Sequence, residues 1–329
     1  MKLRPLGASG LELSALGLGT WAMGGGGWKF GWGRQDERDA IATIARAVDL
    51  GINWVDTAPV YGAGRSEEIV GAALREIPAA RRPLVATKCG RISHSDGTIE
   101  ARLTPDSVRA ECEASLRRLG IETIDLYQFH WPEPADEYVG AWETMADLQR
   151  EGKVRHIGVC NFSVDQLRDL EPLAPVASLQ PPYSMIRREA EAELFPYCAA
   201  HGLGVVAYSP MGKGLLTGRF SPQRAAALDA DDHRSRDPNF APPRLAIHLE
   251  LVEGLARVAA AAGREPAHLA IAWVLRRPEV TSAIVGARSP QQIEETAPAG
   301  DWTLTAEQTS AIDELLDQHA AQLAALGPA

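Results

Sequence analysis

Two kinds of apolar pattern alternate along most of this chain. In the first kind, apolar residues recur at helical spacing, as in residues 36–50, where Ile41, Ile44, Ala45 and Val48 share one face. The second kind is a short, continuous apolar run, which is typical of a buried strand. These runs occupy residues 16–20, 53–56, 84–88, 124–130, 154–159, 177–180, 204–208 and 281–285. The pattern therefore predicts strands that alternate with helices.

The starts of several predicted helices carry capping signals. Thr104 precedes Pro105, and proline suits the first helical position. The Ser/Thr-x-x-Gln spacing of a capping box occurs at 163–166, 289–292 and 305–308. These signals support the helices that the apolar spacing predicts.

Eight predicted strands, most of them followed by a helix, favour one closed fold. Short parallel strands at this interval, without a break in composition, predict a single (β/α)₈ TIM barrel domain over residues 1–329. Residues 2–14 predict a hairpin before the first strand, and the non-periodic residues 209–243 predict a lid after the seventh. A doubly wound sheet is the alternative. It would need a G-x-G-x-x-G motif after the first strand, and Gly17-x-Gly19 does not continue in that way.

Three consecutive predicted strands end in an ionisable residue, at the end of a barrel where active sites lie. These residues are Asp56, Lys88 and His130, and Tyr61 follows five positions after the first. A lysine in a barrel mouth is poorly solvated, and an aspartate partner keeps it charged. The charged Lys88 is then expected to lower the pKa of Tyr61, so that the phenol gives up a proton near neutral pH. His130 can hydrogen-bond a carbonyl oxygen beside it.

The composition of the chain narrows the possible binding partners and the cellular compartment in which the protein is expected. The net charge of −10 and the isoelectric point near 5.4 argue against nucleic acid or an anionic membrane as a partner. Five of the 33 basic residues are lysine, and lysine, unlike arginine, shifts its pKa readily, which supports a special role for Lys88. The four cysteines have neither a C-x-x-C pair nor zinc spacing, so we expect reduced thiols in a cytoplasmic protein. No signal peptide or membrane-spanning run is predicted.

Five motifs that follow one another in order resemble the aldo-keto reductases. They are Gly17-x-Gly19-Thr20-Trp21, Asp56-Thr57-Ala58-x-x-Tyr61-Gly62, Thr87-Lys88, Leu126-Tyr127-Gln128-x-His130-Trp131 and Gly158-Val159-Cys160-Asn161-Phe162. The resemblance runs from the first hairpin to about residue 297. Within the family, the chain looks most like the bacterial branch that also resembles the potassium-channel β subunits. The resemblance implies a nicotinamide-dependent carbonyl reductase in which Tyr61 is the general acid, Lys88 and Asp56 tune it, and His130 orients the substrate.

The resemblance also implies which residues contact the cofactor. Asn161 and Gln180 would bracket the nicotinamide carboxamide, although amides at strand ends are equally often turn residues, and Tyr208 would stack on the ring. The run Ser209-Pro210-Met211-Gly212-Lys213-Gly214-Leu215-Leu216-Thr217-Gly218-Arg219 resembles the family's pyrophosphate clamp. Asp232-x-Arg234 matches a stretch that folds over the cofactor. Thr20, Trp21 and Asp56 complete the expected contacts at the nicotinamide end.

The adenosine end is expected near the last strand. Gly286-Ala287-Arg288 precede the Ser289 cap, and a guanidinium beside a helix N-terminus suits a 2′-phosphate. The resemblance adds Gln292 and Glu295, although Gln292 also fits a capping box and Glu295 a solvated helix face. The expected cofactor is therefore NADP(H), with NAD(H) as the alternative. Cys160 and Thr296 stand where the family often has Ser and Asn, which bears on cofactor affinity and choice but not on proton transfer.

Two other classes of function compete with the reductase. A non-catalytic redox sensor that keeps the cofactor as a ligand is suggested by the channel β subunits, but the four catalytic positions are all present. A metal-dependent barrel hydrolase needs several ligands at strand ends, and only His130 and His156 lie near such positions, so no metal is expected.

Aromatic residues predict the wall of the substrate pocket. Trp28, Phe30, Trp32 and Trp131 are its candidates, although Trp131 fits a core position as well. Such a pocket accepts sugars, pyridoxal-like rings or aliphatic aldehydes. The partner is thus a small carbonyl or alcohol, and the chain is expected to be a monomer or a homo-oligomer.

Overall fold

The computed structural model describes residues 1–327 and contains a closed barrel of eight parallel strands. The strands follow one another around the barrel in the order β10-β11-β12-β3-β4-β5-β8-β9. Their bounds are β3 Leu16–Gly19, β4 Trp54–Asp56, β5 Leu84–Cys89, β8 Ile124–Phe129, β9 Val154–Cys160, β10 Ser178–Gln180, β11 Gly204–Tyr208 and β12 Val280–Gly286. The (β/α)₈ barrel predicted from the alternating pattern is therefore confirmed.

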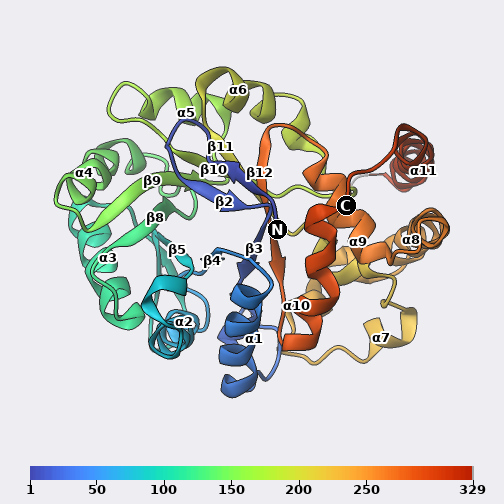
Figure 1. Ribbon diagram of the computed structural model, residues 1–329, viewed down its shortest axis with the longest axis horizontal. Helices are drawn as coiled ribbons and strands as arrows, with labels where there is room; N and C mark the ends of the chain where they lie inside the picture. Colours follow the sequence, from blue (N-terminus) through green and yellow to red (C-terminus); the bar gives the residue numbers. More distant parts are fainter. Residues whose placement is uncertain (328–329) are drawn as a thin grey trace.

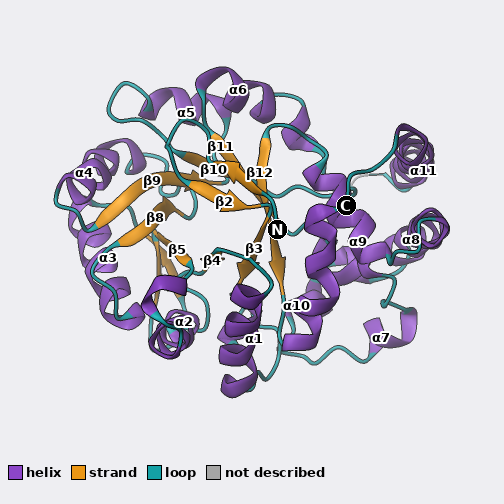
Figure 2. Ribbon diagram, in the orientation of Figure 1, coloured by secondary structure: helices purple, strands orange, loops and turns teal. Residues whose placement is uncertain are grey.

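Helices surround these strands on the outside (Figures 1 and 2). They are α1 Glu37–Asp49, α2 Arg65–Glu76, α3 Pro105–Leu119, α4 Tyr138–Arg150, α5 Val164–Leu170, α6 Leu194–His201, α7 Pro222–Ala226, α8 Arg244–Ala261, α9 Pro266–Leu275, α10 Pro290–Thr296 and α11 Ala306–Ala325. The main apolar core lies between the barrel and these helices, because outward-facing strand residues such as Val55, Val85 and Tyr127 join it. None of the described helices is long and apolar enough to span a bilayer.

The helix caps form as their sequences predict, with one difference. Capping boxes close at Ser163 with Gln166 and at Thr305 with Gln308. Ser289 accepts a hydrogen bond from the Gln292 backbone, but the Gln292 side chain accepts from the backbone N–H of Arg288 instead. Gln292 therefore stabilises the turn that carries Arg288.

The predicted N-terminal hairpin, β1 (Leu3–Pro5) with β2 (Glu12–Ser14), closes the end of the barrel where the strands begin. Arg4 donates to the carbonyl of Val280 at the start of β12, and Leu6 and Leu13 pack on Trp54 inside the barrel. A Cβ on Gly17 would lie 2.1 Å from the Trp54 ring, so glycine is needed there. With this end filled by side chains, chemistry is confined to the opposite end, where the strands finish.

Two segments after strands contain structure that apolar spacing does not predict. β6 (Arg91–Ser93) and β7 (Ile99–Ala101) form a small hairpin after β5. The lid, residues 209–243, contains α7 and 3₁₀ turns at Gly212–Thr217, His233–Arg236 and Pro238–Phe240. These elements are too short to produce a helical period, but Leu215, Phe220 and Phe240 give the lid its own apolar cluster.

Candidate active site

A buried ion pair lies at the C-terminal end of the barrel. Asp56 ends β4, and Lys88 lies on the neighbouring parallel strand β5. The Lys88 ammonium nitrogen is 2.7 and 2.6 Å from the two Asp56 oxygens and also donates to the Thr57 carbonyl at 3.0 Å. Lys88 is completely buried and Asp56 is 3% exposed. Burial alone would lower the pKa of Lys88, but the Asp56 carboxylate, together with the neighbouring Tyr61 and Cys160, raises it, so the lysine stays charged.

Tyr61 reaches this pair from the loop after β4. Its phenol oxygen lies 3.4 Å from the Lys88 ammonium nitrogen. The next residue, Gly62, has φ +63° and packs on the backbone of Gly24, where a Cβ would come within 2.2 Å of the Gly24 oxygen. This close approach of two loops, which only glycine permits, holds Tyr61 at the barrel mouth.

The lowering of the Tyr61 pKa that Lys88 was expected to cause is outweighed by burial. Burial raises the pKa of Tyr61 above its ordinary value, and the opposing charge of Lys88 does not compensate. Lys88 acts in the expected direction, but the expected net lowering of the Tyr61 pKa is not found in the protein without a bound cofactor, because transferring the phenolate out of water costs more than one ammonium returns. The phenol stays protonated, as a proton donor must be.

His130 stands beside the phenol as a neutral ring. It follows β8, and its ring centroid lies 5.7 Å from that of Tyr61 at an interplanar angle of 81°. Burial, with the charges of Lys88 and Arg91, holds the pKa of His130 well below its ordinary value. Its Nδ1 is buried and has no hydrogen-bond partner within residues 1–327.

Three further strand-end residues connect to this group. Gln180 donates to Asp56 at 3.2 Å. The Tyr208 hydroxyl donates to the Asn161 side-chain oxygen at 2.9 Å, and the Asn161 amide donates to the His130 carbonyl at 3.0 Å. Asn161 has a left-handed φ of 62°, an uncommon conformation for a non-glycine residue. The structure thus brings together all the residues predicted at the nicotinamide end.

The loop after β3 supplies an aromatic wall beside Tyr61. The ring centroids of Trp21 and Trp28 lie 6.3 and 6.4 Å from that of Tyr61, and Phe30 packs on Trp28. Thr20, just before this loop, donates its hydroxyl to the Asp56 carbonyl at 3.0 Å.

His233 of the lid completes this wall, with its ring centroid 4.8 Å from Trp21 and 4.7 Å from Trp32. Sequence reasoning missed His233, although it lies between the predicted Asp232 and Arg234. Trp131, in contrast, is 36% exposed and packs under Arg91, so no described contact joins it to the wall.

The lid continues directly from Tyr208 through strained backbone. Ser209 and Lys213 have φ of 57° and 56°, and Gly212 and Gly214 are also left-handed. Lys213 forms an ion pair with Asp237 at 2.8 Å. Pro210 and Met211 lie between these positions, and Met211 packs on the main core.

Arginine contacts tie the lid to its surroundings. Arg219 pairs with Glu295 of α10 at 2.7 Å. Arg234 pairs with Asp232 at 2.6 Å and covers the Trp32 ring, with its guanidinium carbon 4.6 Å from the ring centroid. Trp32 and Asp232 themselves pair as an isolated β-bridge. The lid and the loop after β3 therefore meet over the barrel mouth.

The Arg288 guanidinium forms hydrogen bonds to other groups of the protein. Its guanidinium donates to the carbonyls of Trp32 and Arg34 and, at 2.9 Å, to the side chain of Gln35. Gln35 returns a bond to the Arg288 carbonyl at 3.0 Å and is 6% exposed. Of the two preceding predicted residues, Gly286 ends β12 and Ala287 links it to this turn. The residue predicted to hold a 2′-phosphate thus anchors the loop after β3, and Gln35, its partner, was not predicted.

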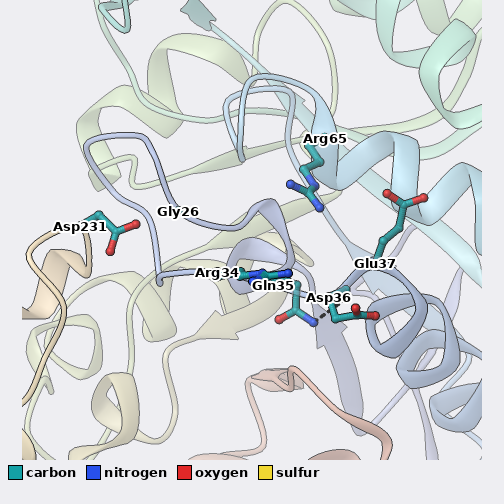
Figure 3. Close-up of a pocket in the computed structure, with 7 residues that line it drawn as sticks. All are labelled: Gly26, Arg34, Gln35, Asp36, Glu37, Arg65 and Asp231. Atoms are coloured by element: carbon teal, nitrogen blue, oxygen red, sulfur yellow. Dashed lines mark hydrogen bonds between the residues drawn. The ribbon is translucent and has the colours of Figure 1, made fainter.

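A separate cavity lies beside the loop after β3. It measures about 510 Å³ and is lined by Gly26, Arg34, Gln35, Asp36, Glu37, Arg65 and Asp231 (Figure 3). None of the predicted catalytic or cofactor residues lines it. It also lacks the aromatic wall, so the barrel mouth, and not this cavity, is the candidate active site.

A dinucleotide cofactor fits the chemistry of the residues at the mouth. Asn161 and Gln180 retain amide hydrogen-bonding capacity beyond the bonds they make, and the Tyr208 ring is held by its hydroxyl. Lys213 adds a partly exposed cation on the lid. Within residues 1–327, no group of three His, Cys, Asp or Glu side chains is arranged to hold a metal.

Comparisons with known proteins identify the family of the chain. The profile of the Aldo/keto reductase family matches residues 15–317. Aldo-keto reductase YhdN of Bacillus subtilis is 37% identical over 87% of this chain and 86% of its own. An NADH-specific methylglyoxal reductase of Escherichia coli is 35% identical over 95% of this chain and all of its own.

Solved structures show the same relationship. The glycerol dehydrogenase AKR11B4 of Gluconobacter oxydans superimposes with a TM-score of 0.87 at 37% identity, over 96% of this chain and 95% of its own. Aldo-keto reductase AKR11C1 of Bacillus halodurans gives a TM-score of 0.77 at 28% identity, over 96% of both chains. The sequence motifs, the barrel and these relatives lead to one conclusion: the chain belongs to the aldo/keto reductase family and is a nicotinamide-dependent oxidoreductase that acts on carbonyl groups.

Proposed function

We propose that the protein reduces small aldehydes and ketones to alcohols with Tyr61 as the general acid. The observation that carries this proposal is the phenol oxygen of Tyr61, 3.4 Å from an ammonium that is held by a buried carboxylate. When bound, the reduced nicotinamide supplies the hydride that the carbonyl carbon takes up. The Tyr61 hydroxyl donates a hydrogen bond to the carbonyl oxygen and transfers its proton as charge develops there. Lys88 stabilises the phenolate that remains, and Asp56 keeps Lys88 charged and in place.

His130 orients the carbonyl in this proposal. A proton on Nδ1 would leave a buried N–H donor without an acceptor, so we assign the proton to Nε2. The Nε2–H then donates a second hydrogen bond to the substrate oxygen. Because the ring is neutral, His130 polarises the carbonyl without competing with Tyr61 as the acid.

The cofactor is held by residues from three places in this proposal. Asn161, Gln180 and Tyr208 bind the nicotinamide, Lys213 and its neighbours in the lid bind the pyrophosphate, and the start of α10 binds the adenosine. Thr20 and Trp21 border the nicotinamide end, next to Asp56.

The experiment is steady-state turnover with a panel of carbonyls. Oxidation of NADPH and NADH is followed with methylglyoxal, 4-nitrobenzaldehyde, simple ketones and aldoses. We include methylglyoxal because one relative is named as its reductase. Turnover of at least one aldehyde supports the proposal, whereas cofactor binding without any turnover favours the redox sensor.

Arg288 leads to a prediction about cofactor choice. Its donors already serve Trp32, Arg34 and Gln35, so we propose that it supports the cofactor site through the loop and that NADH is accepted as well as NADPH. Arg288→Ala is then expected to raise the KM of both cofactors to a similar extent, about three- to tenfold. Arg277→Ala, which removes an arginine paired with Glu279, is the control and should change neither KM. A loss confined to NADPH would assign Arg288 to the 2′-phosphate instead.

The pKa of Tyr61 sets the alkaline limit of reduction. The acid form of the phenol is present below its pKa, and burial raises that pKa above its ordinary value. We therefore expect kcat/KM for aldehyde reduction to show no loss from Tyr61 ionisation between about pH 7 and pH 10, the ordinary phenol pKa. A fall by tenfold per pH unit beginning near pH 7 would show that the phenol ionises at neutral pH, as the sequence had suggested.

A further inference from the structure

A line of polar side chains runs from the lid to the last helix. Lys213 pairs with Asp237 at 2.8 Å, and the other Asp237 oxygen accepts two bonds at 3.0 Å from the backbone and side-chain N–H groups of Asn239. The Asn239 side-chain oxygen lies 3.1 Å from Nε2 of His248. Nδ1 of His248 lies 2.9 Å from Nε2 of His319. The line joins the lid to α8 and α11, which pack on each other (Figure 1).

Hydrogen-bond chemistry assigns one direction to this line. A carboxylate only accepts, so the Asn239 amide N–H must donate to Asp237, and the Asn239 oxygen must accept. His248 therefore carries its proton on Nε2 and accepts at Nδ1, and His319 carries a proton on Nε2. In each hydrogen bond of the line, the N–H group therefore points toward the Asp237 end. Asp237 also accepts a hydrogen bond from the Lys213 ammonium.

Burial makes the far end of the line rigid. His248 is 1% exposed and His319 is 5% exposed, and burial lowers the pKa of both, so both are neutral. An unpaired imidazole nitrogen in this place would be costly, which holds the two rings in register. The groups whose charges act on His248 are His319 on α11, Arg244 on α8 and Asp237 on the lid.

At the near end of the line, the structure of residues 1–327 gives the Lys213 ammonium one side-chain partner, Asp237. Lys213 lies in a left-handed conformation between two left-handed glycines, so the regular backbone of a helix or strand does not restrain it. Its side chain is 31% exposed, and Asp237 is its ion-pair partner. The ammonium is therefore held by Asp237. Backbone hydrogen bonds to Arg234 and Phe240 fix the Asp237 main chain, and Asn239, which His248 contacts in turn, orients the Asp237 carboxylate.

We propose that Asp237, Asn239, His248 and His319 are positioning residues that hold the Lys213 ammonium where the cofactor's pyrophosphate binds. The inference rests on the proposed function, in which Lys213 is part of the pyrophosphate clamp. The four residues act through Lys213 and touch neither the substrate nor the reacting atoms. Their removal is expected to weaken cofactor binding and leave the chemical step unchanged.

The first test compares two variants of His248. His248→Phe keeps a planar ring but removes both nitrogens, whereas the side-chain amide of His248→Gln can still donate to Asn239. We expect the Kd for NADH and NADPH, measured by fluorescence titration, to rise about tenfold in His248→Phe with kcat within about twofold of the wild type. His248→Gln should restore most of the affinity. An unchanged Kd in His248→Phe, or equal losses in both variants, would overturn the inference.

The second test substitutes a residue of the lid, so its outcome does not depend on a change at the buried histidines. Asp237→Asn is expected to weaken cofactor binding by a similar factor. Glu113→Gln is the matched control, because Glu113 on α3 pairs with Lys153 at the same 2.8 Å, and it should leave the Kd unchanged. Tighter binding in Asp237→Asn would mean that Asp237 competes with the cofactor for Lys213, which contradicts the proposal.

The wild-type titration separates this inference from the proposed function. If the wild-type protein binds neither NADH nor NADPH, both are overturned. If it binds and turns over but the variants match it, only the positioning line fails.

Discussion

Replacing Tyr61 with phenylalanine is expected to lower kcat for aldehyde reduction by about 10³-fold, within the range that a positioned general acid contributes. The variant keeps the ring that stands near Trp21, Trp28 and His130 and loses only the hydroxyl 3.4 Å from Lys88. Cofactor affinity should therefore change little, and the loss should appear in kcat. Steady-state kinetics and a cofactor titration measure the two effects separately.

A matched control exists for this substitution. Tyr138→Phe removes a phenol hydroxyl that bonds Asp169 at 2.6 Å, on α4 outside the barrel, and should retain full turnover. If Tyr61→Phe keeps wild-type kcat, Tyr61 is not the acid. A large rise in cofactor Kd with kcat unchanged would instead place the hydroxyl in cofactor binding.

Replacing Lys88 with methionine is expected to lower both stability and activity. Lys88 is completely buried, so its removal leaves the Asp56 carboxylate without its cation in the barrel interior. Breaking a buried ion pair in this way costs about 3–5 kcal/mol of unfolding free energy. Activity should fall by at least 10²-fold, because nothing then stabilises the phenolate that forms when Tyr61 donates its proton. Urea unfolding and turnover at low denaturant measure the two losses.

The double variant Asp56→Asn with Lys88→Met separates these causes. It removes both charges, so we expect it to regain much of the stability that Lys88→Met loses while remaining inactive. If the double variant is as unstable as the single one, packing and not the unpaired carboxylate accounts for the loss. If it regains activity, Lys88 has no part in proton transfer.

The fold was predictable because its signals are local. Short apolar runs in alternation with helical spacing are visible in the sequence, and caps such as Ser163 with Gln166 formed as predicted. The hairpin over Arg91–Ala101 and the turns inside the lid were not predictable in this way, because three-residue strands and 3₁₀ turns are too short to produce a period.

The convergence of polar residues at the barrel mouth was predictable for a different reason. Strand order in a barrel brings the ends of consecutive strands together, so Asp56, Lys88 and His130 had to converge once eight strands were recognised. His233 and Gln35 were not predictable, because a histidine in a lid and a glutamine in a glycine-rich loop carry no local signal. Their roles arise only when the lid and the loop after β3 meet.

The sequence by itself therefore determined the barrel, the residue types at its mouth and the family to which the chain belongs, since all of these depend on patterns between near neighbours. The tertiary structure alone decided the energetics of the site. The direction of the Tyr61 pKa depends on how much water the folded chain excludes, and the role of Arg288 depends on which carbonyls lie beside it. Burial and contacts between distant segments are properties of the folded chain, so no local pattern records them.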